Sequence, residues 1–199
     1  GAPRATPRII KFVAGRRKKF WNKNCVTLGL ASGFIEPLES TSIHLVQSGL
    51  ANFMTLFPDR RFSPTEIEQY NRVMTWEFER IRDFIVLHYK ATERNDSPFW
   101  DYCRNMSVPD FLQHKMDLFR DRGRIFRENN ELFNDTSWFA VMVGQNIRPR
   151  SYDPLVDVMS EDELRRRLAH IKETISKSAD YMPSHREFIE KHCKARAER

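Results

Sequence analysis

Glycine is scarce in this sequence: only seven occur in 199 residues, at positions 1, 15, 29, 33, 49, 123 and 144. No two of them have the spacing of a G-x-G-x-x-G loop, the tight turn that lets a backbone approach a dinucleotide pyrophosphate. Gly29 and Gly33 have three residues between them and do not supply that turn. The sequence therefore contains no pyrophosphate-binding loop of this kind.

Cysteine is also rare, and the three residues, Cys25, Cys103 and Cys193, are odd in number and far apart. This pattern predicts neither a disulfide framework nor a zinc site, and the six histidines are scattered as well. We expect no bound metal. The sequence has no apolar run of membrane-spanning length and no signal-peptide pattern, so we expect a soluble cytoplasmic protein without a membrane partner.

The charge balance is basic but mixed. There are 33 lysines and arginines against 27 acidic residues, a net charge of +6, and the pI is about 9.4. Such a balance raises nucleic acid as a partner. However, acids and bases are interleaved, as where Glu161–Glu163 precedes Arg165–Arg167, which is typical of a solvated helix face. No nucleic-acid-binding motif accompanies the charge, so we expect no nucleic-acid partner.

The pattern of apolar residues changes along the chain. Alternation in 8–13 and 18–21 around Gly15 predicts a β-hairpin, and 25–28 predicts a third strand. These strands look like the end of a sheet whose remainder is elsewhere. From residue 38 onward, helical periodicity and start signals predict a series of helices, at 45–57, 64–90, 99–104, 110–122, 137–144, from 161 and after Pro183. The predicted fold class is mainly α with a few N-terminal β-strands.

Between these two parts lies a turn rich in polar groups. Glu36, Glu39, Ser40, Thr41 and Ser42 fall within seven residues, after a glycine-containing break and around Pro37. The backbone N–H groups of a helix start can hold an anion, and a carboxylate beside them can stabilise a developing positive charge. The simpler interpretation is a helix start capped by Ser40 or Thr41. His44, just beyond, is expected to be structural.

Four segments resemble one enzyme family. They are Asn22–Ile43, Phe99–Trp100, Ser137–Gln145 and Met182–His185, and they closely resemble the flavin-dependent tryptophan halogenases. The resemblance implies the C-terminal portion of an FAD-dependent (glutathione-reductase-type) monooxygenase/halogenase fold. Residues 1–37 would end the FAD-binding domain with a β-hairpin, a strand and the catalytic loop, and residues 38–199 would form the helical substrate-binding cap.

The resemblance assigns roles residue by residue. Glu39 matches the catalytic carboxylate that orients the oxidant and accepts the proton of the substituted ring. Thr41 and Ser42 match the halide-binding pair, with Ser40 in support, although many relatives have glycine where Ser42 stands. Leu30 and Ile43 match backbone neighbours of the flavin ring. Glu36, the competing carboxylate, is interpreted as structural.

Family members also carry a catalytic lysine and a W-x-W-x-I-P motif in their N-terminal half. The resemblance implies that the catalytic lysine, this motif and the FAD pyrophosphate site all lie outside these 199 residues. Trp21, Trp76, Trp100 and Trp138 are never two residues apart, as the motif requires. The expectation is that this chain needs the missing N-terminal half and does not catalyse the reaction alone.

The resemblance implies FAD, reduced by a separate flavin reductase, and a chloride or bromide ion as cofactors. It implies an electron-rich aromatic substrate, indole- or tryptophan-like, and allows a homodimer. Residues 127–134, where tryptophan-specific members are rich in aromatics, contain one aromatic residue. A phenol, indole or carrier-bound ring therefore stays open. Two alternatives remain, a related FAD-dependent monooxygenase that does not halogenate and a stand-alone helical binding module.

Overall fold

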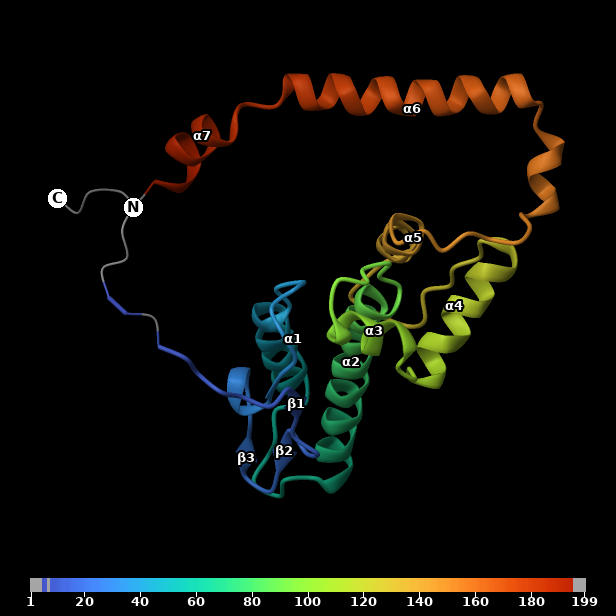
Figure 1. Cartoon of the computed structure of the whole chain (residues 1–199). Coiled ribbons are helices and arrows are strands. Elements are labelled where there is room, and N and C mark those ends of the chain that lie inside the picture. The colour runs from blue at the N-terminus through green and yellow to red at the C-terminus, as the bar shows by residue number, and fades with distance from the viewer. Residues whose placement is uncertain (1–4, 7, 195–199) are drawn as a thin grey trace. The chain divides into compact units, whose positions relative to one another are not determined.

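The structure is a computed structural model that describes residues 5, 6 and 8–194 (Figure 1). The chain divides into two compact units, residues 1–151 and residues 152–199. The first unit contains all the predicted site residues. The expected division at residue 37 concerns function and stays a prediction, since it does not coincide with a boundary between compact units.

The first unit is organised around one long helix, α2 (Pro64–Lys90). In Figure 1 this helix, in green, lies beside α1 (Ser42–Thr55). Helix α2 also contacts α3 (Pro98–Asn105), α4 (Asp110–Arg122) and α5 (Asp135–Gly144). The predicted series of helices is confirmed, because each begins and ends within a few residues of its local signals.

Those signals act in different ways. Pro64 occupies the first turn of α2, where its missing N–H costs nothing. Gly123 ends α4 in the left-handed conformation, with φ of 69°. The Asn134 side chain caps α5 by accepting from the N–H of Ser137. The sequence Ser63-Pro64-Thr65-Glu66 predicts a capping box at the start of α2, and this prediction is wrong, because the Ser63 side chain makes no cap hydrogen bond.

The predicted β-hairpin around Gly15 is also wrong. Strand β1 (Gly15–Arg16) contains the glycine and pairs antiparallel with β4 (Gly33–Phe34). A hairpin forms further along, where β2 (Trp21–Asn22) pairs with β3 (Cys25–Val26). The buried Phe20 and Trp21 decide this register because both side chains pack against α2. A short 3₁₀ turn, η1 (Gly29–Ala31), joins β3 to β4.

Two apolar clusters divide the length of α2. The first joins the N-terminal hairpin to the early part of α2 and to α1, and contains Phe20, Trp21, Leu45, Tyr70, Met74, Phe78, Ile81 and Ile85. The second joins the later part of α2 to α4 and α5, and contains Phe84, Leu87, Leu112, Met116, Phe119, Trp138, Met142 and Ile147. Phe133 packs against both clusters. The helix is thus held on two sides and is a rigid support for residues at its C-terminal end.

Tyr70 yields a prediction for alkaline pH. Its side chain is fully buried and its hydroxyl donates to the Gly49 carbonyl oxygen. Burial, with the nearby Glu77 carboxylate, raises the pKa of Tyr70 to about 12. The folded-state pKa lies above the unfolded value of about 10, so the stability contributed by neutral Tyr70 is complete below pH 10 and is lost as the pH rises through 12.

Ultraviolet absorbance titration of the wild-type protein and of Tyr70→Phe tests this expectation. The difference between the two curves should contain one phenol that ionises near pH 12. A phenol that has fully ionised by pH 10 would contradict the buried position of the hydroxyl.

The second unit begins with a 3₁₀ turn, η2 (Pro154–Val158), followed by α6 (Glu161–Tyr181), α7 (His185–Phe188) and a π-helical turn, η3 (Ile189–Cys193). The predicted start of α6 is confirmed, with the Ser160 side chain accepting from the N–H of Glu163. Within residues 5, 6 and 8–194, no helix combines the length and the apolar character needed to cross a membrane.

Candidate active site

The turn that precedes α1 is tightly wound. Ser40 N–H donates to the Pro37 carbonyl oxygen at 3.0 Å, and Ser40 has a φ of 52°. A serine in this left-handed region carries strain that the surroundings must hold. The consequence is a sharp reversal directly after Glu39. It sends the chain into α1 with Thr41 at the N-cap position.

The start of α1 leaves backbone donors unused. The first helical hydrogen bond runs from Leu45 N–H to the Thr41 carbonyl oxygen, so the N–H groups of residues 42–44 lie at the open end of the helix. The interpretation of Ser40 or Thr41 as a side-chain cap is wrong, since the Thr41 hydroxyl makes no cap bond and the Ser40 hydroxyl reaches back to Pro37. Thr41 is buried and Ser42 is exposed. A left-handed residue followed by successive free N–H groups is a concavity that suits an anion.

Glu39 is held from α2. Its Oε1 lies 3.2 Å from Nε2 of His88, and its side chain is 31% exposed. The other imidazole nitrogen of His88, Nδ1, lies 2.8 Å from the Phe84 carbonyl oxygen. The site carboxylate is therefore tied to the rigid helix and partly open to solvent.

Glu36, three residues earlier, is held by the next residue of the same helix. The Tyr89 hydroxyl donates to Glu36 Oε2 at 3.0 Å, and the Leu38 N–H donates to Glu36 Oε1 at 2.9 Å. Burial first, and then this hydrogen bond to Glu36, raises the pKa of Tyr89. Both oxygens of Glu36 are thus engaged in bracing the turn, which supports a structural role for this carboxylate.

A cavity of about 680 Å³ lies along α1 and α2. On the helix side, the Glu77 carboxylate accepts from the Ser48 hydroxyl at 2.6 Å and lies 2.8 Å from His44 Nε2. The pairing with Glu77 agrees with the expected structural role of His44. The opposite wall is formed by the segment upstream of α5, which contributes Arg127, Asn129, Asn130, Glu131 and Leu132.

That segment is anchored by a buried ion pair. Lys115 Nζ of α4 lies 3.0 Å from Glu131 Oε1, and the two side chains are 6% and 2% exposed. Glu131 Oε2 accepts from the Trp138 indole N–H at 3.0 Å, and Lys115 also donates to the Phe126 carbonyl oxygen. Charges buried this deeply are tolerated only when paired and hydrogen-bonded. The network fixes the cavity wall onto α4 and α5.

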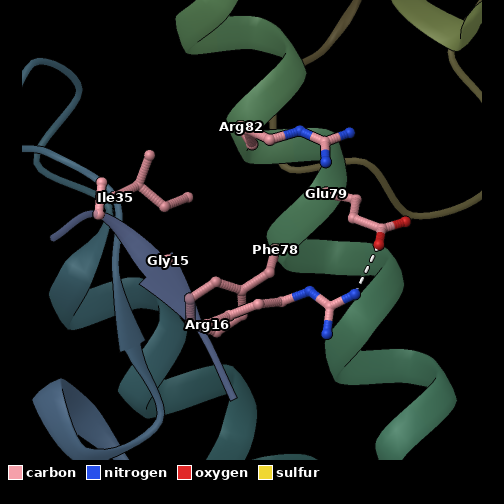
Figure 2. Close-up of a pocket in the computed structure, with 7 residues that line it drawn as sticks. Gly15, Arg16, Ile35, Phe78, Glu79 and Arg82 are labelled. Atoms are coloured by element: carbon pink, nitrogen blue, oxygen red, sulfur yellow. Dashed lines mark hydrogen bonds and ion pairs between the residues drawn. The ribbon is translucent and has the colours of Figure 1, made fainter. Parts of the chain in front are cut away.

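A smaller cavity, of about 220 Å³, lies between β1 and α2 (Figure 2). Arg16 reaches from β1 to Glu79 on α2, with 2.6 Å between NH2 and Oε1, and the aromatic ring of Phe78 lies beside it. None of the predicted site residues lines this cavity or the cavity along α1 and α2. The ion pair of Arg16 and Glu79 fastens the N-terminal strands to α2. Across the described residues, no cluster of His, Cys, Asp and Glu side chains could hold a metal ion.

Comparison with known proteins shows the family. The family profile described as tryptophan halogenase matches residues 1–161. The chain belongs to the tryptophan halogenase family. Among curated relatives, tryptophan 7-halogenase RebH of Lentzea aerocolonigenes is 30% identical over 90% of this chain and 37% of its own length.

Solved structures of tryptophan halogenase relatives match the fold. Xcc4156, a flavin-dependent halogenase from Xanthomonas campestris, is 45% identical with a TM-score of 0.92, over 98% of this chain and 39% of its own. BrvH, a flavin-dependent halogenase from Brevundimonas sp. BAL3, is 43% identical with a TM-score of 0.91, over 96% of this chain and 39% of its own. The chain spans less than two fifths of the length of these relatives. The predicted fold class is confirmed.

The structure also shows contacts of this turn that the sequence did not reveal. It brings Glu39, Thr41 and Ser42 together at the start of α1, whereas Leu30 lies in η1, which packs against the same helix. Neither His88 nor Tyr89 was singled out as a partner of the turn. The only signal was a histidine on the apolar face of a long helix, which by itself is typical of core structure.

Proposed function

We propose that this chain supplies the ring-side carboxylate and the halide site of a flavin-dependent halogenase that acts on an electron-rich aromatic ring. The observation that carries the proposal is the single turn holding a partly exposed Glu39 next to the open N-terminus of α1. Halogenation of a ring needs both features, because a halide must be held before it is oxidised and a ring proton must be removed after substitution. The family membership supports the same reaction.

In this proposal Glu39 stabilises the positive charge that develops on the substituted ring and then accepts the ring proton. A carboxylate suits both tasks. Thr41 and Ser42 hold the halide through backbone N–H groups and hydroxyls. Ser40, whose left-handed conformation reverses the chain, supports both by fixing their relative positions. We also propose that residues 1–37 end the flavin domain and that residues 38–199 form the substrate cap.

Two exposed aliphatic side chains fit the flavin. Leu30 in η1 is 77% exposed and Ile43 in α1 is 73% exposed. Exposed apolar side chains on adjoining elements are suited to cover a flat aromatic ring, and their backbone groups can contact its polar edge. Bound FAD, reduced by a separate flavin reductase, would supply with O2 the oxidising equivalents for the halide. The pyrophosphate site and the catalytic lysine would come from the remainder of the enzyme.

The cavity along α1 and α2 supports an aromatic substrate that carries a polar part. Its wall contains Trp76 together with Arg72, Arg127, Asn129 and Asn130. An aromatic side chain with a few convergent polar groups is the composition of small-molecule sites. Apart from Trp76, the wall offers little aromatic surface for stacking against the indole ring of free tryptophan. An indole, phenol or carrier-bound ring therefore fits better than free tryptophan.

An assay of the full-length protein tests the proposal. It should be supplied with a flavin reductase, FAD, NADH, O2, bromide and indole, and the products examined by mass spectrometry. A brominated ring supports the halogenase. A hydroxylated ring with no halogen would favour a related monooxygenase, and no product with any electron-rich ring would favour a binding role.

The halide site gives a more specific prediction. We expect the full-length enzyme to brominate faster than it chlorinates, because bromide is less strongly hydrated and easier to oxidise. Thr41→Val should weaken apparent halide binding about 2- to 12-fold, since removing one neutral hydrogen bond costs roughly 0.5–1.5 kcal/mol. Halide titrations of wild type and variant measure this, with mixed chloride and bromide for the preference. An unchanged halide constant would place the anion away from the Thr41 hydroxyl.

A further inference from the structure

The contact between His88 and Glu39 defines where protons must lie. A carbonyl oxygen only accepts hydrogen bonds, so His88 Nδ1, 2.8 Å from the Phe84 carbonyl oxygen, carries a proton. In a neutral imidazole Nε2 then has a lone pair, which would face Glu39 Oε1 at 3.2 Å and repel it. The contact is attractive when Nε2 also carries a proton, as an ion pair between the imidazolium ring and the carboxylate.

The imidazole is held more firmly than the carboxylate. His88 lies near the end of α2, with its side chain 18% exposed and its ring edge-on to Phe84 at 5.0 Å between centroids. Phe84 in turn stacks on Phe133 at 3.8 Å and packs against Trp138. Glu39 lies on a turn outside any helix or strand. His88 is thus placed on a packed helix from which it can position the carboxylate of the turn.

The contact also leaves one carboxylate oxygen available. His88 occupies Oε1 of Glu39, and among residues 5, 6 and 8–194 no group is found bonded to Oε2. Glu36 differs, because Tyr89 and the Leu38 N–H engage both of its oxygens. Tyr89 and the Leu38 N–H together engage both oxygens of Glu36, whereas His88 engages one oxygen of Glu39.

We propose that His88 is the positioning residue of Glu39: through Nε2 it fixes Oε1 and directs the free Oε2 toward the reacting ring. This rests on the proposed function for its effect on the reaction, but the contact between His88 and Glu39 is a property of the protein itself. The proposal adds no chemical step. Glu39 remains the group that meets the ring, and His88 acts only through it.

Two variants separate positioning from simple packing. The amide nitrogen of glutamine reaches the place of Nε2, whereas that of asparagine reaches only the place of Nδ1. His88→Asn should therefore lower the kcat for halogenation about 10- to 100-fold, the usual cost of losing an orienting partner, with little change in the KM for the ring. His88→Gln should stay close to wild type. Equal kcat values for the two variants would overturn the proposal.

A spectroscopic measurement tests the contact between His88 and Glu39 without any turnover. In full-length protein labelled with ¹⁵N-histidine, long-range ¹H–¹⁵N correlation spectra report whether each ring nitrogen carries a proton, and the His88 signals are assigned by their loss in His88→Gln. We expect both nitrogens of His88 to carry proton character in the wild type and Nε2 to change in Glu39→Gln. An Nε2 that does not respond to Glu39→Gln overturns the proposal. If His88 Nε2 responds to Glu39→Gln but the wild type does not halogenate, only the proposed function is contradicted.

Discussion

Glu39→Gln in the full-length enzyme should lower ring halogenation about 10²- to 10⁴-fold, the range of effects expected when a positioned general base is lost. Glutamine has almost the shape of glutamate, so the turn should keep its conformation, but the amide neither accepts the ring proton nor stabilises a cationic ring as a carboxylate does. Binding of FAD and consumption of NADH and O2 should continue, because the carboxylate acts on the ring. Product formation and peroxide release, measured in parallel, check both expectations.

Glu36→Gln is the matched control for this experiment. Glu36 is in the same turn, but its oxygens accept from Tyr89 and Leu38 and so brace the backbone. An amide oxygen can keep one of these hydrogen bonds, so we expect a much smaller loss of product than in Glu39→Gln. If Glu36→Gln lost as much product as Glu39→Gln, or more, the roles of the two carboxylates would be reversed.

Lys115→Met should destabilise the first unit by about 3–5 kcal/mol, because it leaves the buried Glu131 carboxylate without its cation. The Glu131 side chain is 2% exposed, and its carboxylate keeps the hydrogen bonds from the Trp138 indole and the backbone N–H of Glu128. The midpoint of urea unfolding, followed by tryptophan fluorescence, should fall accordingly. The loss of stability should be greatest in the segment that carries Glu131 and lines the cavity. Proteolysis within residues 123–134 should therefore also become faster.

The double variant Lys115→Met/Glu131→Gln controls for the other contacts that Lys115 loses. It removes both charges but keeps an amide oxygen for the Trp138 indole N–H, so it should recover much of the lost stability. If the double variant were as unstable as Lys115→Met, the loss would come from the missing contacts of the Lys115 ammonium group with the rings of Phe111 and Trp138 and not from the unpaired carboxylate.

The helices were predictable because their signals are local. In α2, apolar residues return at helical spacing and Pro64 marks the start, so the sequence predicts the same 27 residues that the structure shows. The N-terminal strands were predicted poorly for the opposite reason. Strands of two residues carry almost no periodic signal, and the pairing of β1 with β4 depends on residues that are distant in the chain.

The active-site turn was predicted in part. Its polar composition indicated a place for an anion and a carboxylate, and its resemblance to a known family distinguished Glu39 from Glu36. The absence of side-chain capping by Thr41 was not predictable, because it depends on the backbone conformation of Ser40. The Lys115–Glu131 pair was equally hidden, since nothing in the sequence indicates which charged residues of an amphipathic chain become buried.

The sequence by itself determined the helical fold class, the family and the identity of the polar turn, because local periodicity and contiguous motifs carry that information. Only the tertiary structure decided which groups hold the turn in place. Tyr89 and Glu36 are 53 residues apart, and His88 and Glu39 are similarly distant. These pairs meet because two apolar clusters fix α2 against the N-terminal strands, α4 and α5. A contact between distant residues depends on the packing of the whole unit, which no local pattern encodes.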